Sequence, residues 1–175
     1  FLLGIGLGLG KYIVSMDGVP YIEYLAIGLL MISAMFTASF ECTYGTYFRL
    51  EFERIYDGIL AAPITVANLF TGEIIWAGTK GLFFSFAVWT IVAIFGVIPF
   101  GLSVFAPLVG LLTGMMFGAL SLFISSFVTS INQFNFYMTG FLSPMFFFSG
   151  VVFPLSNLPA SVQVIAEFMP LTHSV

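Results

Sequence analysis

The chain has 175 residues and a net charge of −4 at pH 7; 60% of its residues are hydrophobic and only 7% are charged. Soluble domains carry roughly 25% charged residues, so this composition excludes a water-soluble protein and indicates an all-α, polytopic membrane protein. The acidic balance gives no support to a nucleic-acid partner, and the single Cys42 can form neither an internal disulfide nor a cysteine-based zinc site.

The first apolar segment, FLLGIGLGLG, covers residues 1–10. It has no basic region before it and no small-residue cleavage site after it, so we interpret it as the end of a spanning helix rather than a signal peptide. Its glycines match neither a dinucleotide fingerprint nor a phosphate loop, and helix packing explains them better. Because the chain starts inside this segment and stops at PLTHSV, we expect it to be incomplete at both ends.

The second span is expected over residues 24–44, after a short polar turn. Glu23 and Glu41 bracket its apolar part and are 18 positions apart, which is about 27 Å along an α-helix. This length is close to the hydrocarbon thickness of a bilayer, so each carboxylate can lie at an interface.

A charged stretch, FRLEFERIYDGILAAP, follows the second span. Its apolar residues recur at steps of three and four, which predicts one amphipathic helix over residues 47–62. The apolar stripe consists of Phe48, Phe52, Ile55, Ile59 and Ala62. We expect this stripe to face the membrane domain and the charged face to be free. Two ion pairs at helical spacing are expected on the charged face, Arg49–Glu53 and Arg54–Asp57.

The rest of the chain supplies three further spans, expected over residues 67–98, 104–128 and 136–153. Pro144 lies inside the last of them and predicts a kink. The remainder, residues 154–170, is punctuated by prolines and contains only pieces too short to span. We expect it to form an external re-entrant or interfacial segment.

The few charged residues also indicate an orientation. Arg49 and Arg54 in the charged stretch outnumber Lys11 in the preceding connection, which places the stretch in the cytoplasm. Composition leaves two interpretations of the stretch open: a solvated helix that joins two spans, or a docking surface for a soluble partner.

Glu73 and Lys80 are seven positions apart, about 10 Å along the axis, so we expect interfacial charges near the cytoplasmic side and no direct pair.

The region SFECTYGTYFRLEFERIYDGILAAPITVANLFTGEIIWAGTKGL resembles the corresponding region of ABC type-2 exporter permeases, nearest their lipo-oligosaccharide export branch. The later MFFFSGVVFPLSNLP and MPLTH resemble the same family near its last span. The resemblance covers essentially the whole chain. It implies a six-span transmembrane domain of a bacterial or archaeal inner membrane, of which this chain is a fragment. It also implies that the charged stretch is a coupling helix, which seats in a groove of a separate ATPase subunit.

On this resemblance the coupling residues are Phe48, Arg49, Glu51, Phe52, Glu53, Arg54, Ile55, Asp57 and Ile59. Glu41 is similar to the family's acidic residue at the end of the second span, and we expect it to pack against the coupling helix, paired with an arginine there. The implied assembly has two permease subunits, expected to be identical, and two ATPase subunits. This chain contains no phosphate loop, so ATP is expected on the ATPase subunit, and no cofactor or metal site is expected here.

The implied function is ATP-driven export of an amphipathic substrate, such as a lipo-oligosaccharide, a polysaccharide or a hydrophobic drug; the residues do not distinguish these. The alternative is an ATP-independent channel or secondary transporter, which we would expect to place charges at mid-membrane. An intramembrane enzyme is disfavoured because Asp17 and Asp57 lie in loops and the only histidine is His173. We therefore expect a transport subunit without catalytic residues.

Overall fold

The computed structural model describes residues 15–16, 18–98, 101–151, 163 and 166–174. The predictions for residues 1–10 and for most of the segment 154–170 lie outside these described residues. The first described element is a small hairpin, in which β1 (Ser15–Met16) pairs antiparallel with β2 (Val19–Pro20). Gly18 has a φ of 83°, a left-handed conformation that glycine adopts without steric cost and that allows this tight turn.

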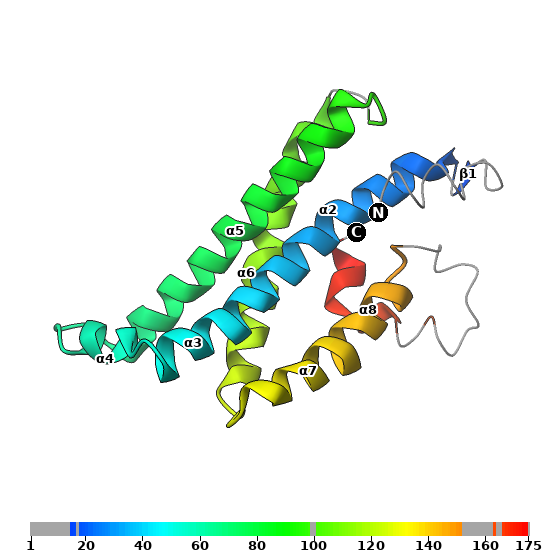
Figure 1. Ribbon diagram of the computed structural model, residues 1–175. Helices are drawn as coiled ribbons and strands as arrows, with labels where there is room; N and C mark the ends of the chain where they lie inside the picture. Colours follow the sequence, from blue (N-terminus) through cyan, green and yellow to red (C-terminus); the bar gives the residue numbers. More distant parts are fainter. Residues whose placement is uncertain (1–14, 17, 99–100, 152–162, 164–165, 175) are drawn as a thin grey trace.

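After this hairpin the chain is helical, and α2 runs through the middle of the molecule (Figure 1). α2 (Tyr21–Phe40) continues through a π-helical turn, η2 (Glu41–Gly45), into α3 (Thr46–Glu51). The three pieces form one continuous helix of 31 residues. α4 (Ile55–Leu60) follows after a short break, at the same end of the molecule as α3.

The long helix α5 (Val66–Ile94) begins at a clear local signal. The Thr65 side chain caps it by accepting a hydrogen bond from the backbone N–H of Asn68, at 3.3 Å. Two residues after the helix ends, Gly96 has a φ of 66°, which turns the chain away from the helix axis. A short 3₁₀ turn, η3 (Leu102–Phe105), then leads into α6 (Ala106–Ser125).

α5 and α6 pack against each other through small residues. A Cβ atom built on Gly81 would lie 2.7 Å from the carbonyl oxygen of Gly110, and one on Gly114 would lie 3.0 Å from the carbonyl oxygen of Ala77. The two backbones therefore approach so closely that no side chain fits between them, as is common where helices associate in lipid. We call this contact the glycine seam; it consists of Ala77, Gly78, Gly81, Gly110 and Gly114.

The region expected as the last span is built from short pieces: η4 (Ile131–Gln133), α7 (Phe134–Tyr137), the π-helical turn η5 (Met138–Leu142) and α8 (Ser143–Phe148). Pro144 lies in the first turn of α8, where its missing N–H and its ring disturb the preceding turn. The wider π turn accommodates this disturbance, and the Ser143 hydroxyl donates to the carbonyl of Met138 at 3.0 Å.

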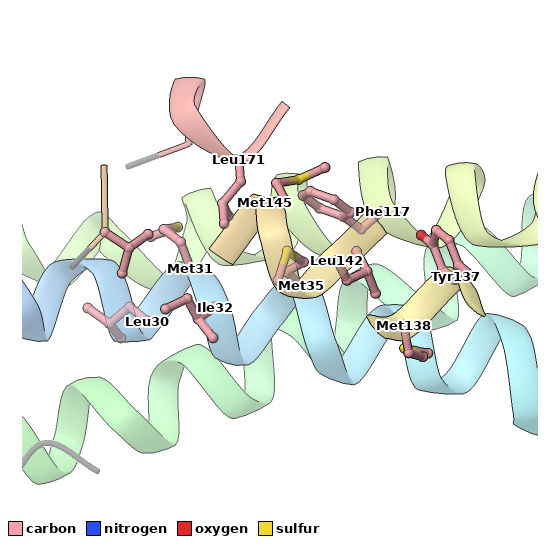
Figure 2. Packing of buried hydrophobic residues seen from close by; sticks show 11 residues of the cluster. Leu30, Met31, Ile32, Met35, Phe117, Tyr137, Met138, Leu142, Met145 and Leu171 are labelled. Atoms are coloured by element: carbon pink, nitrogen blue, oxygen red, sulfur yellow. The ribbon is translucent and has the colours of Figure 1, made fainter. Parts of the chain in front are cut away.

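The main hydrophobic core lies where α2, α6 and the α7–α8 region meet, and Leu171 of η7 (Pro170–His173) reaches the same cluster (Figure 2). The labelled residues from α2 are Leu30, Met31, Ile32 and Met35. Hydrogen bonds add to this packing: the Ser85 hydroxyl donates to the carbonyl of Leu30 at 3.0 Å, and the hydroxyls of Ser121 and Tyr137 are 3.0 Å apart. Such bonds between helices stabilise a helical membrane domain.

Three helices formed by the described residues are long and apolar enough to cross a membrane: Tyr21–Glu51, Val66–Ile94 and Ser103–Ser125. Their length and composition match what a bilayer requires of a spanning helix. The structure therefore confirms the predicted fold class, an all-α polytopic membrane protein.

Candidate functional site

The charged stretch forms a helical hairpin rather than the single helix predicted over residues 47–62. α3 ends at Glu51 and α4 begins at Ile55, with Arg54 between them in the left-handed conformation at a φ of 50°. The backbone N–H groups of Phe52 and Glu53 both bond to the carbonyl of Phe48, which closes the end of α3. We call residues 46–60 the charged hairpin.

The prediction of which side of this stretch faces the membrane domain is also wrong. Phe48, Phe52 and Ile55, from the stripe expected to face the membrane domain, are exposed, while Arg49 turns inward and Tyr56 is buried. The physical reason lies in the partners that the rest of the chain offers. Carboxylates stand at the base of the hairpin, and unpaired carboxylates shielded from water are costly. Pairing them with Arg49 outweighs the burial of a few apolar side chains.

Arg49 bonds to carboxylates from two different helices. Its Nη1 lies 2.7 Å from Glu41 Oε1 at the end of α2, and its Nη2 lies 2.7 Å from Glu73 Oε2 on α5. Its Nε donates to the hydroxyl of Tyr56 at 3.2 Å, and that hydroxyl donates to Glu73 Oε1 at 2.7 Å. Burial raises the pKa of Tyr56, so the phenol keeps the proton that it donates to Glu73. One guanidinium thus joins α2, α4 and α5.

Glu41 also accepts hydrogen bonds from two side chains of α5. Lys80 Nζ lies 2.5 Å from Glu41 Oε2, and the indole Nε1 of Trp76 donates to Glu41 Oε1 at 3.0 Å. The ammonium of Lys80 also lies 5.2 Å from the centre of the Trp76 ring, a cation–π distance. We call this set the charge cluster: Glu41, Arg49, Tyr56, Glu73, Trp76 and Lys80. Its two carboxylates and two cations give it no net formal charge, which reduces the cost of placing it at a membrane edge.

The π-helical turn η2 brings Glu41 and Arg49 onto one face. The two residues are eight positions apart, and in a regular α-helix that spacing turns their side chains about 80° from each other. A π turn accommodates one extra residue, so the spacing acts as seven positions, or about 20°. A Cβ atom on Gly45 would lie 3.3 Å from Glu41 Cδ, so its absence leaves room for the carboxylate to extend along the helix towards Arg49.

The structure places the predicted charged residues in two groups. Arg49 pairs with Glu41, the pairing expected for that carboxylate, and Glu73 and Lys80 belong to the same charge cluster without contacting each other directly. The predicted helical pairs Arg49–Glu53 and Arg54–Asp57 are wrong: among the ion pairs between described residues neither is present. Glu51, Glu53, Arg54 and Asp57 are exposed on the outside of the hairpin, and Ile59 is half-buried.

Sequence reasoning missed three residues of this site: Gly45, Tyr56 and Trp76. A signal existed for Trp76, because Trp76 and Lys80 are four positions apart on α5 and share a face. None existed for Tyr56, whose contact with Arg49 depends on the reversal of the chain at Arg54. Gly45 matters only through the π turn, which periodicity does not reveal.

The cluster offers no metal site. In the part of the chain that the structure describes, no group of three or more His, Cys, Asp or Glu side chains could hold a metal ion. Beneath the hairpin lies a cavity of about 240 Å³, lined mainly by apolar side chains of α3, α4, α5 and α6 and by Glu73. Tyr56 is the only buried residue of α4. The hairpin therefore rests on α5 mainly through the polar contacts of the charge cluster.

Comparison with known proteins places the chain in a family. The family model of the ABC-2 type transporter matches residues 1–175. Nodulation protein J of Sinorhizobium fredii is 36% identical over 174 residues, covering 99% of this chain and 66% of the relative. Nodulation protein J of Rhizobium meliloti is 34% identical over 175 residues, covering 100% of this chain and 67% of the relative.

A more distant relative is the inner membrane transport permease YadH of Escherichia coli, which is 25% identical over 169 residues and covers 95% of this chain and 65% of its own length. The chain spans about two thirds of the length of these curated relatives. No solved structure matches it. With a family match over its full length and three helices that can cross a bilayer, the chain belongs to the ABC-2 type transporter family of multi-pass membrane proteins.

Proposed function

We propose that this chain is part of the permease subunit of an ATP-driven exporter in the bacterial inner membrane. The observation that supports this most directly is the charged hairpin, residues 46–60, which we assign as the coupling hairpin. Its inner side is tied to α2 and α5 by the charge cluster, while Phe48, Phe52 and Ile55 on its outer side are exposed. A segment attached in this way can receive a displacement from a soluble partner and pass it to two spanning helices.

In the proposed assembly two copies of the permease bind two ABC ATPase subunits, and ATP is bound and hydrolysed on the ATPase subunits. Closure of the ATPases pushes on the coupling hairpins. Arg49 then transfers the displacement to α2 through Glu41 and to α5 through Glu73, which switches the spans between inward-facing and outward-facing states. We assign the outer residues to contact with the ATPase and Arg49 to anchoring, because Arg49 already bonds to Glu41, Glu73 and Tyr56.

We propose an amphipathic substrate, with a lipo-oligosaccharide first and a polysaccharide or a hydrophobic drug as the other candidates. The similarity to nodulation protein J over the full chain supports a nodulation-related molecule. Exposed aromatic side chains are frequent on the spans, and aromatic faces suit both sugar rings and acyl chains.

The test is reconstitution of the full-length permease in inside-out vesicles, with and without its ABC ATPase subunit. We expect accumulation of labelled lipo-oligosaccharide only when both subunits and ATP are present. An ATPase variant that binds but does not hydrolyse ATP is the matched control and should give no accumulation. Transport that proceeds equally well without the ATPase would show a channel or a secondary transporter instead.

A further inference from the structure

The outer side of the coupling hairpin carries apolar side chains that nothing in the described structure covers. Phe48 and Phe52 stack on each other with ring centres 4.9 Å apart, and their exposed fractions are 50% and 64%. Ile55, at the start of α4, is 41% exposed. A contiguous exposed group of this kind marks an interaction surface when it lies outside the lipid.

The same stretch of chain carries exposed charged side chains. Glu51, Glu53 and Asp57 are exposed, as is Arg54, and none of them belongs to an ion pair between described residues. Arg49 contributes nothing to this surface because Glu41 and Glu73 hold it on the inner side. The outer face, defined as Phe48, Glu51, Phe52, Glu53, Arg54, Ile55 and Asp57, thus carries three negative charges and one positive charge.

This composition indicates what the outer face does not contact. Four exposed charged side chains lie within ten residues of Phe48 in the chain, and charged side chains are costly in lipid, so the face cannot lie in hydrocarbon. The cytoplasmic surface of a bilayer is negatively charged and attracts basic segments, so it repels a face with an excess of carboxylates. A soluble protein surface remains as the occupant that fits.

We infer that the outer face seats in a groove of the ATPase subunit that has an apolar floor and a rim of lysine or arginine side chains. The Phe48–Phe52 stack fills the floor, and Glu51, Glu53 and Asp57 meet the basic rim. In protein interfaces, aromatic residues at the centre contribute to affinity, and complementary charges at the edge steer the partners together. The inference rests on the proposed function and adds the chemistry of the partner's surface.

The experiment measures the dissociation constant between the full-length permease in nanodiscs and the ABC ATPase subunit of the reconstitution above, at about 50 mM and about 300 mM salt. Opposite charges across an interface lose attraction as salt screens them. We expect binding to weaken roughly tenfold between the two salt concentrations. The double variant Glu51→Lys with Glu53→Lys should bind roughly tenfold or more weakly at low salt and nearly like the parent at high salt.

Two further variants separate the charge from other effects. Phe52→Ala removes part of the apolar stack and should weaken binding by a similar factor at both salt concentrations, because burial of apolar area is not screened. Glu23→Lys reverses the charge of one carboxylate in the first turn of α2, away from the hairpin, and should leave the dissociation constant unchanged. Conservative changes, Glu53→Gln and Asp57→Asn, should show smaller losses in the same direction.

Tighter binding of the lysine variant, or binding that strengthens with salt, would overturn the inference and indicate an acidic rim. Equal binding of parent and lysine variants at both salt concentrations would overturn it as well, while ATP-driven transport would leave the proposed function standing. Absence of any binding between the parent permease and the ATPase would remove the proposed function itself, and the inference with it.

Discussion

Arg49 and Arg54 are five positions apart in one charged stretch, yet they occupy opposite environments. Arg49 has a side chain only 22% exposed and bonds to two carboxylates and a phenol, whereas Arg54 is exposed and belongs to no ion pair between described residues. Residue type alone does not separate them. The difference arises from the left-handed turn at Arg54, which brings Tyr56 back towards Arg49.

Replacement of Arg49 by alanine should strongly destabilise the protein. Glu73, which is 13% exposed, would lose the cation that pairs with it, while Glu41 would keep only Lys80, and a carboxylate left unpaired away from water is costly. We expect a loss of about 2–4 kcal/mol in the free energy of unfolding, measured by denaturant titration in detergent. Arg54→Ala is the matched control and should change stability by no more than about 0.5 kcal/mol. Equal stability of the two variants would contradict this account of Arg49.

Arg54 itself has an unfavourable backbone conformation. At a φ of 50° a side chain with a Cβ atom costs about 1–2 kcal/mol relative to the right-handed region, a cost that glycine avoids. Arg54→Gly should therefore raise the midpoint of thermal unfolding, by an amount corresponding to about 0.5–1 kcal/mol after the entropy of glycine is subtracted. Arg54→Val should lower it, because a β-branched side chain tolerates this conformation least. A higher midpoint for Arg54→Val than for Arg54→Gly would show that the chain is not left-handed at this position.

At the scale of the element, the π turn η2 determines how α3 continues α2. Gly45 can be tested against Gly58, since both lie in helical turns of the same region and a Cβ atom at Gly58 meets nothing within 4 Å. Gly58→Ala should stabilise the protein by about 0.5–1 kcal/mol through helix propensity. Gly45→Ala should not give this gain, because its Cβ atom would lie 3.3 Å from Glu41 Cδ and displace the carboxylate.

The fluorescence of Trp76 reports on that displacement. With Trp89→Phe as background, Trp76 is the only tryptophan, and its indole donates to Glu41 in the parent protein. We expect a shifted emission maximum for Gly45→Ala and none for Gly58→Ala. Equal gains in stability and identical spectra for the two variants would contradict the proposed role of Gly45.

Which elements could be read from the sequence depends on the kind of contact that forms them. The membrane helices follow from long apolar runs, and α5 and α6 lie close to where those runs predict them. The hairpin does not follow from such a run. Its periodic pattern predicts a buried apolar stripe only if apolar residues turn towards the protein. Here Glu41 and Glu73, distant in sequence, attract Arg49, and the apolar stripe is left outside. The pairing of Glu41 with an arginine, which was expected from the family resemblance and not from periodicity, is present in the structure.

At the scale of the whole molecule, the proposal requires the hairpin and the turn after α5 to lie on opposite sides of the membrane. The protein suits cysteine labelling, because Cys42 is its only cysteine and is buried. In sealed cells Glu53→Cys should react with a membrane-impermeant maleimide only after the membrane is opened, whereas Gly101→Cys should react at once. Both positions are exposed. Reaction of Glu53→Cys from outside the cell would reverse the orientation and exclude docking to a cytoplasmic ATPase.

The glycine seam has a mechanical consequence. At Gly81 and Gly114 the backbones of α5 and α6 approach so closely that no side chain lies between them to absorb a shearing force. We therefore expect the two helices to tilt together as one rigid unit, and α5 alone is about 43 Å long. In the proposed mechanism, a small displacement at Glu73, where Arg49 bonds near the start of α5, becomes an opposite displacement at the far end of the two helices, which would link the ATPase to the other side of the membrane without a change between the helices.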